Sequence, residues 1–261
     1  MAALLLHFCA AVGAVGGLGL GLLQLSKSLP LLPYQESMLD GSSSVSETRP
    51  DVVLVLGYQA NHYTAEPSSI LRARVEQGVE RGCESSSRIV LLSGGLDLRF
   101  YNASLPTEAD IMLRWVLFIS ASPPAPHSSF AFIEPECEGR DFCSVKRAIR
   151  DDCELTFLLE RRATSTLENA LGCFTALAAD PANDRWTHME LITTAFHELR
   201  ALAVFRKQAR VQGRSAWDFT VPPRAVAAAC SSPSPIESHS RQINWIREVA
   251  ALALYWTKGW I

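Results

Sequence analysis

The chain has 261 residues, enough for one α/β domain with a sizeable core. Hydrophobic residues make up 48% of it and charged residues 20%, a composition typical of a globular protein with an added apolar segment. The net charge of -3 lacks the basic excess of a nucleic-acid-binding surface, so we expect no nucleic-acid partner.

An uncharged apolar segment begins the chain. Residues 2–25 contain no charged side chain, and about 20 apolar residues are enough to span a bilayer. No basic residue precedes the segment, and no clear cleavage site ends it. We interpret residues 1–25 as an uncleaved signal anchor, with a cleaved signal peptide and a buried helix as alternatives. Residues 26–50, rich in proline and serine, are expected to be a linker.

Two sequence features give opposite indications of the cellular compartment in which the chain after the apolar segment lies. Lys27 follows the apolar segment and favours a cytoplasmic body, whereas the glycosylation sequon at Asn102 matters only in a secretory lumen. Six cysteines lie outside the apolar segment, and an even set suits disulfides, with free buried thiols as the alternative. No cysteine–histidine spacing typical of zinc is present. We therefore expect no metal site, and the sequence indicates no particular cofactor.

Apolar runs alternate with helical stripes from residue 51 onward. Residues 51–57 and 88–95 are continuous apolar runs ending in glycine, a pattern typical of strands buried on both faces. The alternation predicts an α/β fold: a doubly wound, mostly parallel, Rossmann-like sheet with helices on both faces. Further strands are expected at 155–159, 188–193 and 217–221, and helices at 68–81, 107–119, 165–178, 196–211 and 237–258.

Residues 120–152 interrupt this alternation. They contain four prolines and two of the cysteines, and they are long for a connection between a helix and a strand. We expect an insertion or lid here, with a short strand at 130–133 inside it.

Polar residues gather where the expected strands end. Residues 158–169, LLERRATSTLEN, and 191–200, LITTAFHELR, each run from an apolar strand through a polar break into a helix. Open α/β sheets bind ligands at the carboxyl ends of their strands, where helix N-termini also offer free amides to anions. The two segments therefore predict one shared site.

Glu160 and His197 are the candidate catalytic residues. Glu160 ends an apolar strand, with a salt bridge to a neighbouring arginine as the alternative reading. Histidine titrates near neutral pH and serves as a general acid or base, although a lone histidine is more often structural. Ser165 and Glu168 have capping-box spacing, which explains both without a ligand, and Thr107 and Asp110 have the same spacing.

The candidate ligand-binding residues are glycines that admit close backbone approach, arginines suited to an anion, and polar groups near the strand ends. Each has a structural alternative: a tight turn for the glycines, and a solvated helix side chain for the others. Neither a GxGxxG nor a Walker sequence is present, which disfavours NAD and P-loop binding. The candidates are Gly57, Arg74, Ser93, Gly94, Gly95, Glu108, Thr164, Thr166, Glu168, Asn169 and Arg200.

Six motifs in order resemble the YdcF-like family, domain of unknown function 218, which includes SanA-like bacterial envelope proteins. They are DVVLVLG (51–57), LRARVEQG (71–78), IVLLSGG (89–95), TEADIM (107–112), LERRATSTLENA (159–170) and ITTAFHELRALAVF (192–205). The resemblance covers most of 51–211 and assigns 51–261 to a YdcF-like domain. It implies a Rossmann-like fold, often behind a membrane segment, and a polar pocket at the matching positions. It implies no reaction, and the 120–152 insertion departs from the family pattern.

Three functions are compatible with these features. The first is a membrane-tethered domain that binds a small anionic ligand, phosphorylated or nucleotide-like, as a hydrolase or group transferase. The second is a tethered protein that binds such a ligand without turnover. The third is a structural protein of the envelope or secretory lumen.

Overall fold

The computed structural model describes residues 49–58, 60–96, 105–120, 142–179, 185–222, 248 and 250–261. The chain divides into two units, Met1–Thr48 and Arg49–Ile261. The predicted anchor, nearly all of the predicted linker and the sequon at Asn102 lie outside the described residues. Within the described ranges, no helix combines the length and the apolar character needed to cross a bilayer.

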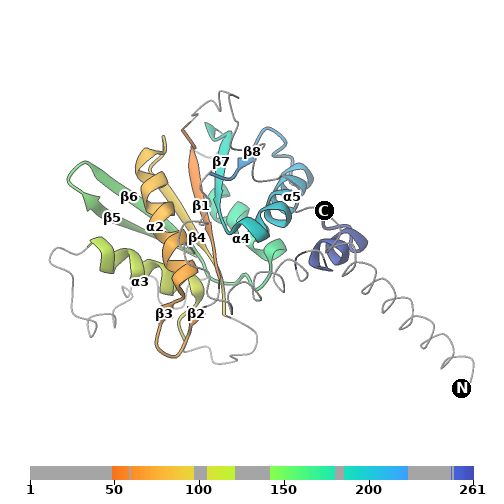
Figure 1. Cartoon of the computed structure of the whole chain (residues 1–261). Coiled ribbons are helices and arrows are strands. Elements are labelled where there is room, and N and C mark those ends of the chain that lie inside the picture. The colour runs from red at the N-terminus through yellow and green to blue at the C-terminus, as the bar shows by residue number, and fades with distance from the viewer. Residues whose placement is uncertain are drawn as a thin grey trace, which may run out of the picture. The chain divides into compact units, whose positions relative to one another are not determined.

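A six-stranded sheet forms the centre of the second unit (Figure 1), which confirms a mixed α/β protein with a mostly parallel sheet. The strand order is β5-β6-β4-β1-β7-β8, and only the β5–β6 pair is antiparallel. β2 (Ala60–Asn61) and β3 (Glu66–Pro67) form a separate small hairpin. The strands of the main sheet are β1 Val52–Leu56, β4 Ile89–Ser93, β5 Phe142–Arg150, β6 Cys153–Glu160, β7 His188–Ile192 and β8 Asp218–Thr220.

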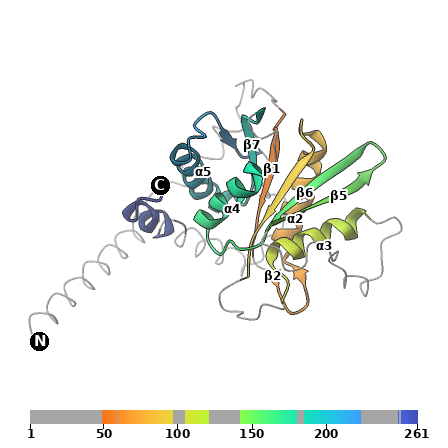
Figure 2. The same cartoon turned by 180° about the vertical axis from the view of Figure 1, so that it is seen from behind.

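Hydrophobic clusters lie on both sides of the sheet. Successive residues of β1 alternate between them, because side chains along a strand point to opposite faces. Helices α2 and α3 contribute to one cluster and helices α4 and α5 to the other. Figures 1 and 2 show where these helices lie along the sheet. Residues 250–257 are also helical. The helices are α2 Ser69–Glu84, α3 Glu108–Ser120, α4 Thr166–Ala178 and α5 Ala195–Val211.

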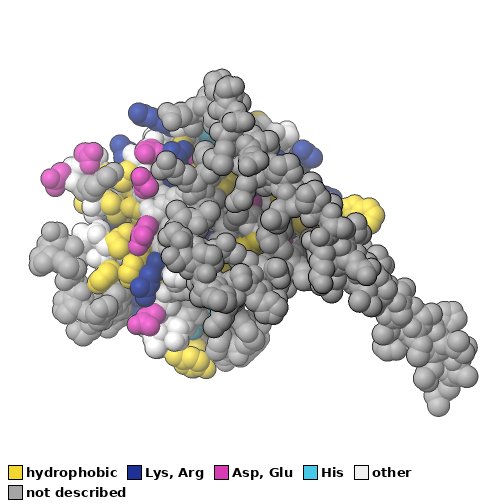
Figure 3. All heavy atoms as spheres, viewed as in Figure 1, with side chains coloured by type: hydrophobic (Ala, Val, Ile, Leu, Met, Phe, Trp, Pro, Cys, Tyr) yellow, Lys and Arg dark blue, Asp and Glu magenta, His cyan; other side chains and the backbone are white. Residues whose placement is uncertain are grey.

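The surface of the face that carries α2 and α3 is mixed in character. Figure 3 shows acidic, basic and apolar side chains interspersed over its described part, with no single-sign patch there. Cation–aromatic contact contributes to this face: the Arg72 guanidinium lies 4.6 Å from the centre of the Trp115 ring.

Residues 142–150, inside the expected insertion, form the strand β5, which was not predicted from the sequence. This strand pairs with β6 from Phe142 opposite Glu160 to Arg150 opposite Cys153. Cys143, Val145 and Ile149 lie at alternate positions, interrupted by Arg147, and belong to the cluster on the α2 and α3 side. That period of two is the strand signal, and it was hidden behind the prolines and cysteines that precede it. The remainder of the predicted insertion, including 130–133, lies outside the described residues.

One disulfide joins Cys83, near the end of α2, to Cys153, at the start of β6; their Cα atoms are 5.7 Å apart. Cys143 is also disulfide-bonded, whereas Cys173 is free and buried. Both readings of the cysteines are thus realised in one chain. The Cys83–Cys153 bond lies at the amino ends of the strands, away from the polar breaks.

We expect the double substitution Cys83→Ser and Cys153→Ser to lower the free energy of unfolding by about 2–4 kcal/mol. The bond spans 70 residues, and its loss frees the unfolded chain from a long closed loop. Urea unfolding of the wild type and the double variant measures the difference. Equal midpoints for the two proteins would contradict this expectation.

Candidate functional site

Four turns meet at the carboxyl ends of the parallel strands. Gly57 follows β1, Ser93 ends β4, Glu160 ends β6, and Thr194 follows β7. Strands β1, β4, β6 and β7 are adjacent and parallel, so these turns share one edge of the sheet. The N-termini of α4 and α5 lie at the same edge.

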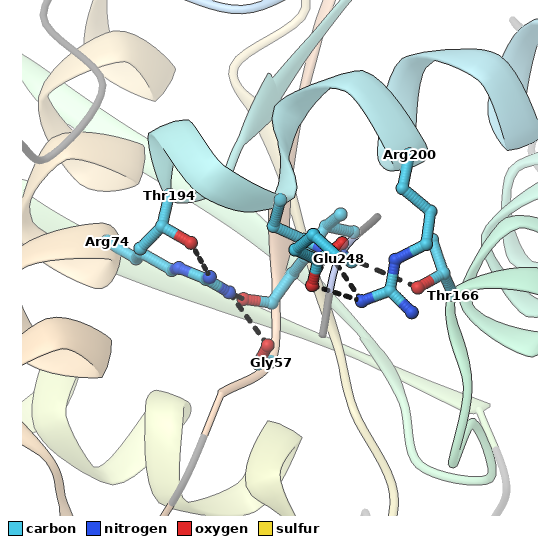
Figure 4. Close-up of polar contacts among 8 residues, drawn as sticks. Gly57, Arg74, Thr166, Thr194, Arg200 and Glu248 are labelled. Atoms are coloured by element: carbon cyan, nitrogen blue, oxygen red, sulfur yellow. Dashed lines mark hydrogen bonds and ion pairs between the residues drawn. The ribbon is translucent and has the colours of Figure 1, made fainter. Parts of the chain in front are cut away.

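Arg74 lies at the centre of this edge, with its side chain extending from α2 (Figure 4). Its Nη1 donates to the carbonyl oxygens of Leu56 at 2.6 Å and Gly57 at 2.7 Å. Its Nη2 donates to Thr194 Oγ1 at 2.9 Å. The guanidinium therefore ties the turn after β1 to the turn after β7. Arg74 is 1% exposed, and the centre of the Tyr58 ring lies 5.0 Å from its guanidinium.

The charge of Arg74 is only partly compensated. Burial lowers its pKa to about 10, against the opposing effect of Glu108, so the side chain is protonated at neutral pH. A guanidinium has five N–H donors, and Nε of Arg74 has no hydrogen-bond partner among the described residues. Arg161 forms an ion pair with Asp110, and Arg200 forms one with Glu248. For Arg74, the described part of the chain supplies no such carboxylate.

A second polar cluster surrounds the imidazole of His197, in the first turn of α5. Nη2 of Arg200 lies 2.8 Å from His197 Nδ1 and donates to Glu248 Oε1 at 2.7 Å. Thr166 Oγ1, at the start of α4, lies 3.4 Å from His197 Nε2. The cluster thus joins α4, α5 and the C-terminal part of the chain, as Figure 4 shows for Thr166, Arg200 and Glu248.

Burial lowers the pKa of His197 to about 4, with the charges of Arg200 and Arg74 adding to the effect and Glu248 opposing it. The imidazole is therefore neutral at pH 7. Burial alone would raise the pKa of Glu248, but hydrogen bonding and charge from His197 and Arg200 bring it below its usual value. Glu248 is therefore ionised at neutral pH.

This shift predicts that His197 makes the fold acid-sensitive. The unfolded chain takes up the imidazole proton below pH 6.5, whereas the folded protein does so only near pH 4, so stability is lost as pH falls between the two. Between pH 7 and pH 4 the free energy of unfolding falls in both proteins. We expect the fall to be about 2–3 kcal/mol smaller for His197→Gln than for the wild type. Urea unfolding at both pH values tests this, and equal losses in the two proteins would contradict it.

Both carboxylate oxygens of Glu160 accept hydrogen bonds from neighbouring groups. Its Oε2 accepts from Ser93 Oγ at 2.7 Å, and its Oε1 accepts from the backbone amides of Arg162 at 2.7 Å and Ala163 at 2.9 Å. Burial raises its pKa, and these hydrogen bonds oppose the rise. Ser93 Oγ also lies 3.0 Å from Asn169 Oδ1. The carboxylate therefore stabilises the turn between β6 and α4 through hydrogen bonds, whereas the structural alternative to its predicted catalytic role was a salt bridge.

The candidate glycines lie where turns of the chain approach each other closely. A Cβ on Gly95 would lie 2.8 Å from Ala163 O, and a Cβ on Gly94 would lie 2.8 Å from the Glu108 Cβ. A Cβ on Gly57 would lie 3.0 Å from Ser93 O and closer still to the Glu108 carboxylate. Packing between the turns therefore accounts for these glycines without a ligand.

Both predicted capping arrangements are present. Thr107 Oγ1 accepts from Asp110 N at 3.2 Å, while Asp110 Oδ2 accepts from Thr107 N at 3.0 Å. Ser165 Oγ accepts from Glu168 N at 3.3 Å, and the Glu168 carboxylate accepts from both N and Oγ1 of Thr164 at 2.7 Å. Glu168 and Thr164 are exposed, so they lie at the rim of the site.

Sequence reasoning missed two residues of this site, Thr194 and Glu248. Thr194 is the N-cap residue of α5, but its side chain makes no capping hydrogen bond and accepts from Arg74 instead. A threonine just before a helical stripe is a readable signal for such a position. Glu248 lies in the segment 237–258, which was predicted only to be a helix. Nothing in the local sequence pattern indicates that its side chain contacts α5.

No family model, curated protein or solved structure that was compared with the chain matches it. Among the described residues, no group of three or more histidine, cysteine, aspartate or glutamate side chains is arranged to hold a metal ion.

Proposed function

We propose that residues 51–261 form a Rossmann-like, doubly wound domain of the YdcF-like type. The five parallel strands lie in the order third, second, first, fourth, fifth along the chain, which is the order of doubly wound nucleotide-binding sheets. The hydrophobic clusters on the two sides of the sheet, with α2 and α3 on one and α4 and α5 on the other, also support this arrangement.

We propose that the domain binds a small anionic ligand, phosphorylated or nucleotide-like, beside Arg74. Arg74 carries this proposal, because it is a fully buried cation for which the described chain supplies no ion-paired carboxylate. It bridges the turns after β1 and β7, the point where the strand order changes direction and where open sheets bind ligands. The amino end of α5, which lacks a side-chain cap, adds positive potential there.

Hydrolysis or group transfer at this site is the second candidate function. His197 favours it, because a buried imidazole that is neutral at pH 7 can hydrogen-bond a reacting oxygen beside the first turn of α4. Glu160 has a positioning role in this scheme, since Ser93 and two backbone amides already occupy both of its oxygens. Binding without turnover is the alternative.

We propose that the apolar segment 2–25 tethers the domain to a membrane, with the domain on the oxidising side. The Cys83–Cys153 disulfide supports this orientation, because such bonds persist in secretory and extracellular compartments. Glycosidase treatment of protein expressed in a secretory cell tests it, with Asn102→Gln as the control. A mobility shift that the control lacks supports a lumenal domain, and no shift argues against it.

Thermal unfolding of the full-length chain with inorganic phosphate, pyrophosphate or a nucleoside diphosphate tests the binding proposal. A ligand that binds only the folded state raises the Tm in a saturable way. Sodium chloride at equal ionic strength controls for screening, and Arg210→Met removes an exposed arginine of α5 as a matched variant. If none of the three anions raises the Tm beyond the salt control, the binding proposal fails.

Phosphate release from the anions that bind tests the second candidate. For an enzyme, we expect His197→Gln to abolish turnover while the ligand still raises the Tm. No turnover by the wild type would reject the catalytic candidate and leave the binding function.

A further inference from the structure

Glu248 reaches the site from a distant part of the chain. Its side chain is 10% exposed, and Oε1 accepts a hydrogen bond from Arg200 Nη2 at 2.7 Å, across 48 residues of sequence (Figure 4). The same Nη2 lies 2.8 Å from Nδ1 of His197. One arginine nitrogen therefore lies between a carboxylate and an imidazole. The Tyr255 ring, centred 5.5 Å from the Arg200 guanidinium, further confines that side chain.

The chemistry of these atoms fixes the proton on the imidazole. A guanidinium nitrogen only donates, so Nδ1 of His197 is the acceptor and carries no proton. In the neutral ring the proton then lies on Nε2, which is 3.4 Å from Thr166 Oγ1. The opposite tautomer would place Nδ1–H against the Arg200 donor at 2.8 Å. The nearest acceptor for that Nδ1–H group, Glu248 Oε1, would be 3.5 Å from Nδ1.

We propose that Glu248 is a positioning residue of the site: it holds Arg200 against Nδ1 and thereby fixes His197 as the Nε2–H tautomer, directed at the start of α4. The charged groups around the imidazole are Arg200 on α5, Glu248 itself and, at longer range, Arg74 on α2. Thr166 on α4 is the hydroxyl that faces it. The carboxylate therefore acts on His197 through the arginine.

This assignment defines what His197 offers to a ligand, a consequence that rests on the proposed function. An Nε2–H group beside the amino end of α4 donates a hydrogen bond to an acceptor such as a phosphoryl oxygen. In this tautomer Nε2 has no free lone pair, so His197 polarises the ligand by donating a hydrogen bond and does not deprotonate an attacking group there. The substrate class is thus one with an oxygen that gains negative charge.

Nuclear magnetic resonance of full-length protein labelled with ¹⁵N-histidine tests the proposal without a ligand. Long-range ¹H–¹⁵N correlations at pH 7 distinguish a protonated from an unprotonated ring nitrogen, and His197→Gln assigns the signal. We expect the wild type to show Nε2–H with bare Nδ1, and Glu248→Ala to populate both tautomers. Glu248→Gln is expected to restore the wild-type pattern, because its amide oxygen still accepts from Arg200.

Arg200→Met provides an independent variant if Glu248→Ala does not fold. With the arginine removed, Nδ1–H can donate to Glu248, and we expect the Nδ1–H tautomer to predominate. A wild-type protein with Nδ1–H, or an unchanged Nε2–H pattern in Glu248→Ala or in Arg200→Met, would overturn the proposal. These readouts are independent of the Tm shift by phosphate or pyrophosphate, so either proposal can fail alone.

Discussion

Arg74→Met is expected to abolish the rise in Tm that the anionic ligand produces and to lower the free energy of unfolding by about 2–4 kcal/mol. The substitution removes the buried cation and leaves two carbonyl oxygens and the Thr194 hydroxyl without their donor. Relief from burying a charge offsets part of this loss, which limits its size. Thermal and urea unfolding, with and without pyrophosphate, measure both effects.

The control for this prediction is Arg74→Lys. Lysine keeps the charge but lacks the planar fork that reaches Leu56, Gly57 and Thr194 together. We expect this variant to be more stable than Arg74→Met and to bind the anion less tightly than the wild type. Full ligand binding by Arg74→Met would show that Arg74 is only a structural link between β1 and β7.

Glu160→Ala is expected to lower the free energy of unfolding by about 3–6 kcal/mol. This is the largest effect that we expect of a single substitution at this edge of the sheet. Three donors lose this acceptor at once: the buried Ser93 hydroxyl and Ala163 amide, and the partly buried amide of Arg162. Each unsatisfied buried donor costs about 1–3 kcal/mol. Urea unfolding at pH 7 gives the loss directly.

Glu160→Gln separates the bracing role from a catalytic one. The amide oxygen of glutamine still accepts from the two backbone amides, and Ser93 Oγ can accept from its NH₂ group. We therefore expect a folded protein that binds the anion as the wild type does. Lost turnover in a stable Glu160→Gln variant would instead restore Glu160 as an acid or base.

The elements of the fold were readable wherever local pattern and burial agree. The runs 51–57 and 88–95 contain the fully buried strands β1 and β4, and continuous apolar sequence is the direct consequence of burial on both faces. β5 was missed because its alternating pattern follows a stretch that reads as irregular. Helix starts were readable from capping residues, whose hydrogen bonds join neighbours in sequence.

The composition of the site was less readable than its position. Glu160 was expected at the end of a strand and His197 at the entrance of the next helix; Glu160 ends β6, and His197 lies in the first turn of α5. The sequence could not show that the amides after Glu160 fold back onto its carboxylate, nor that Glu248 reaches α5. Both facts depend on tertiary packing, which no periodicity records.

Calorimetric titration of the full-length chain with pyrophosphate, at constant ionic strength, tests the central claim most directly. We predict saturable binding by the wild type and by Arg210→Met, and at least about tenfold weaker binding by Arg74→Lys, a difference of about 1.4 kcal/mol. No binding by the wild type, or equal affinity in a folded Arg74→Lys variant, would contradict the account.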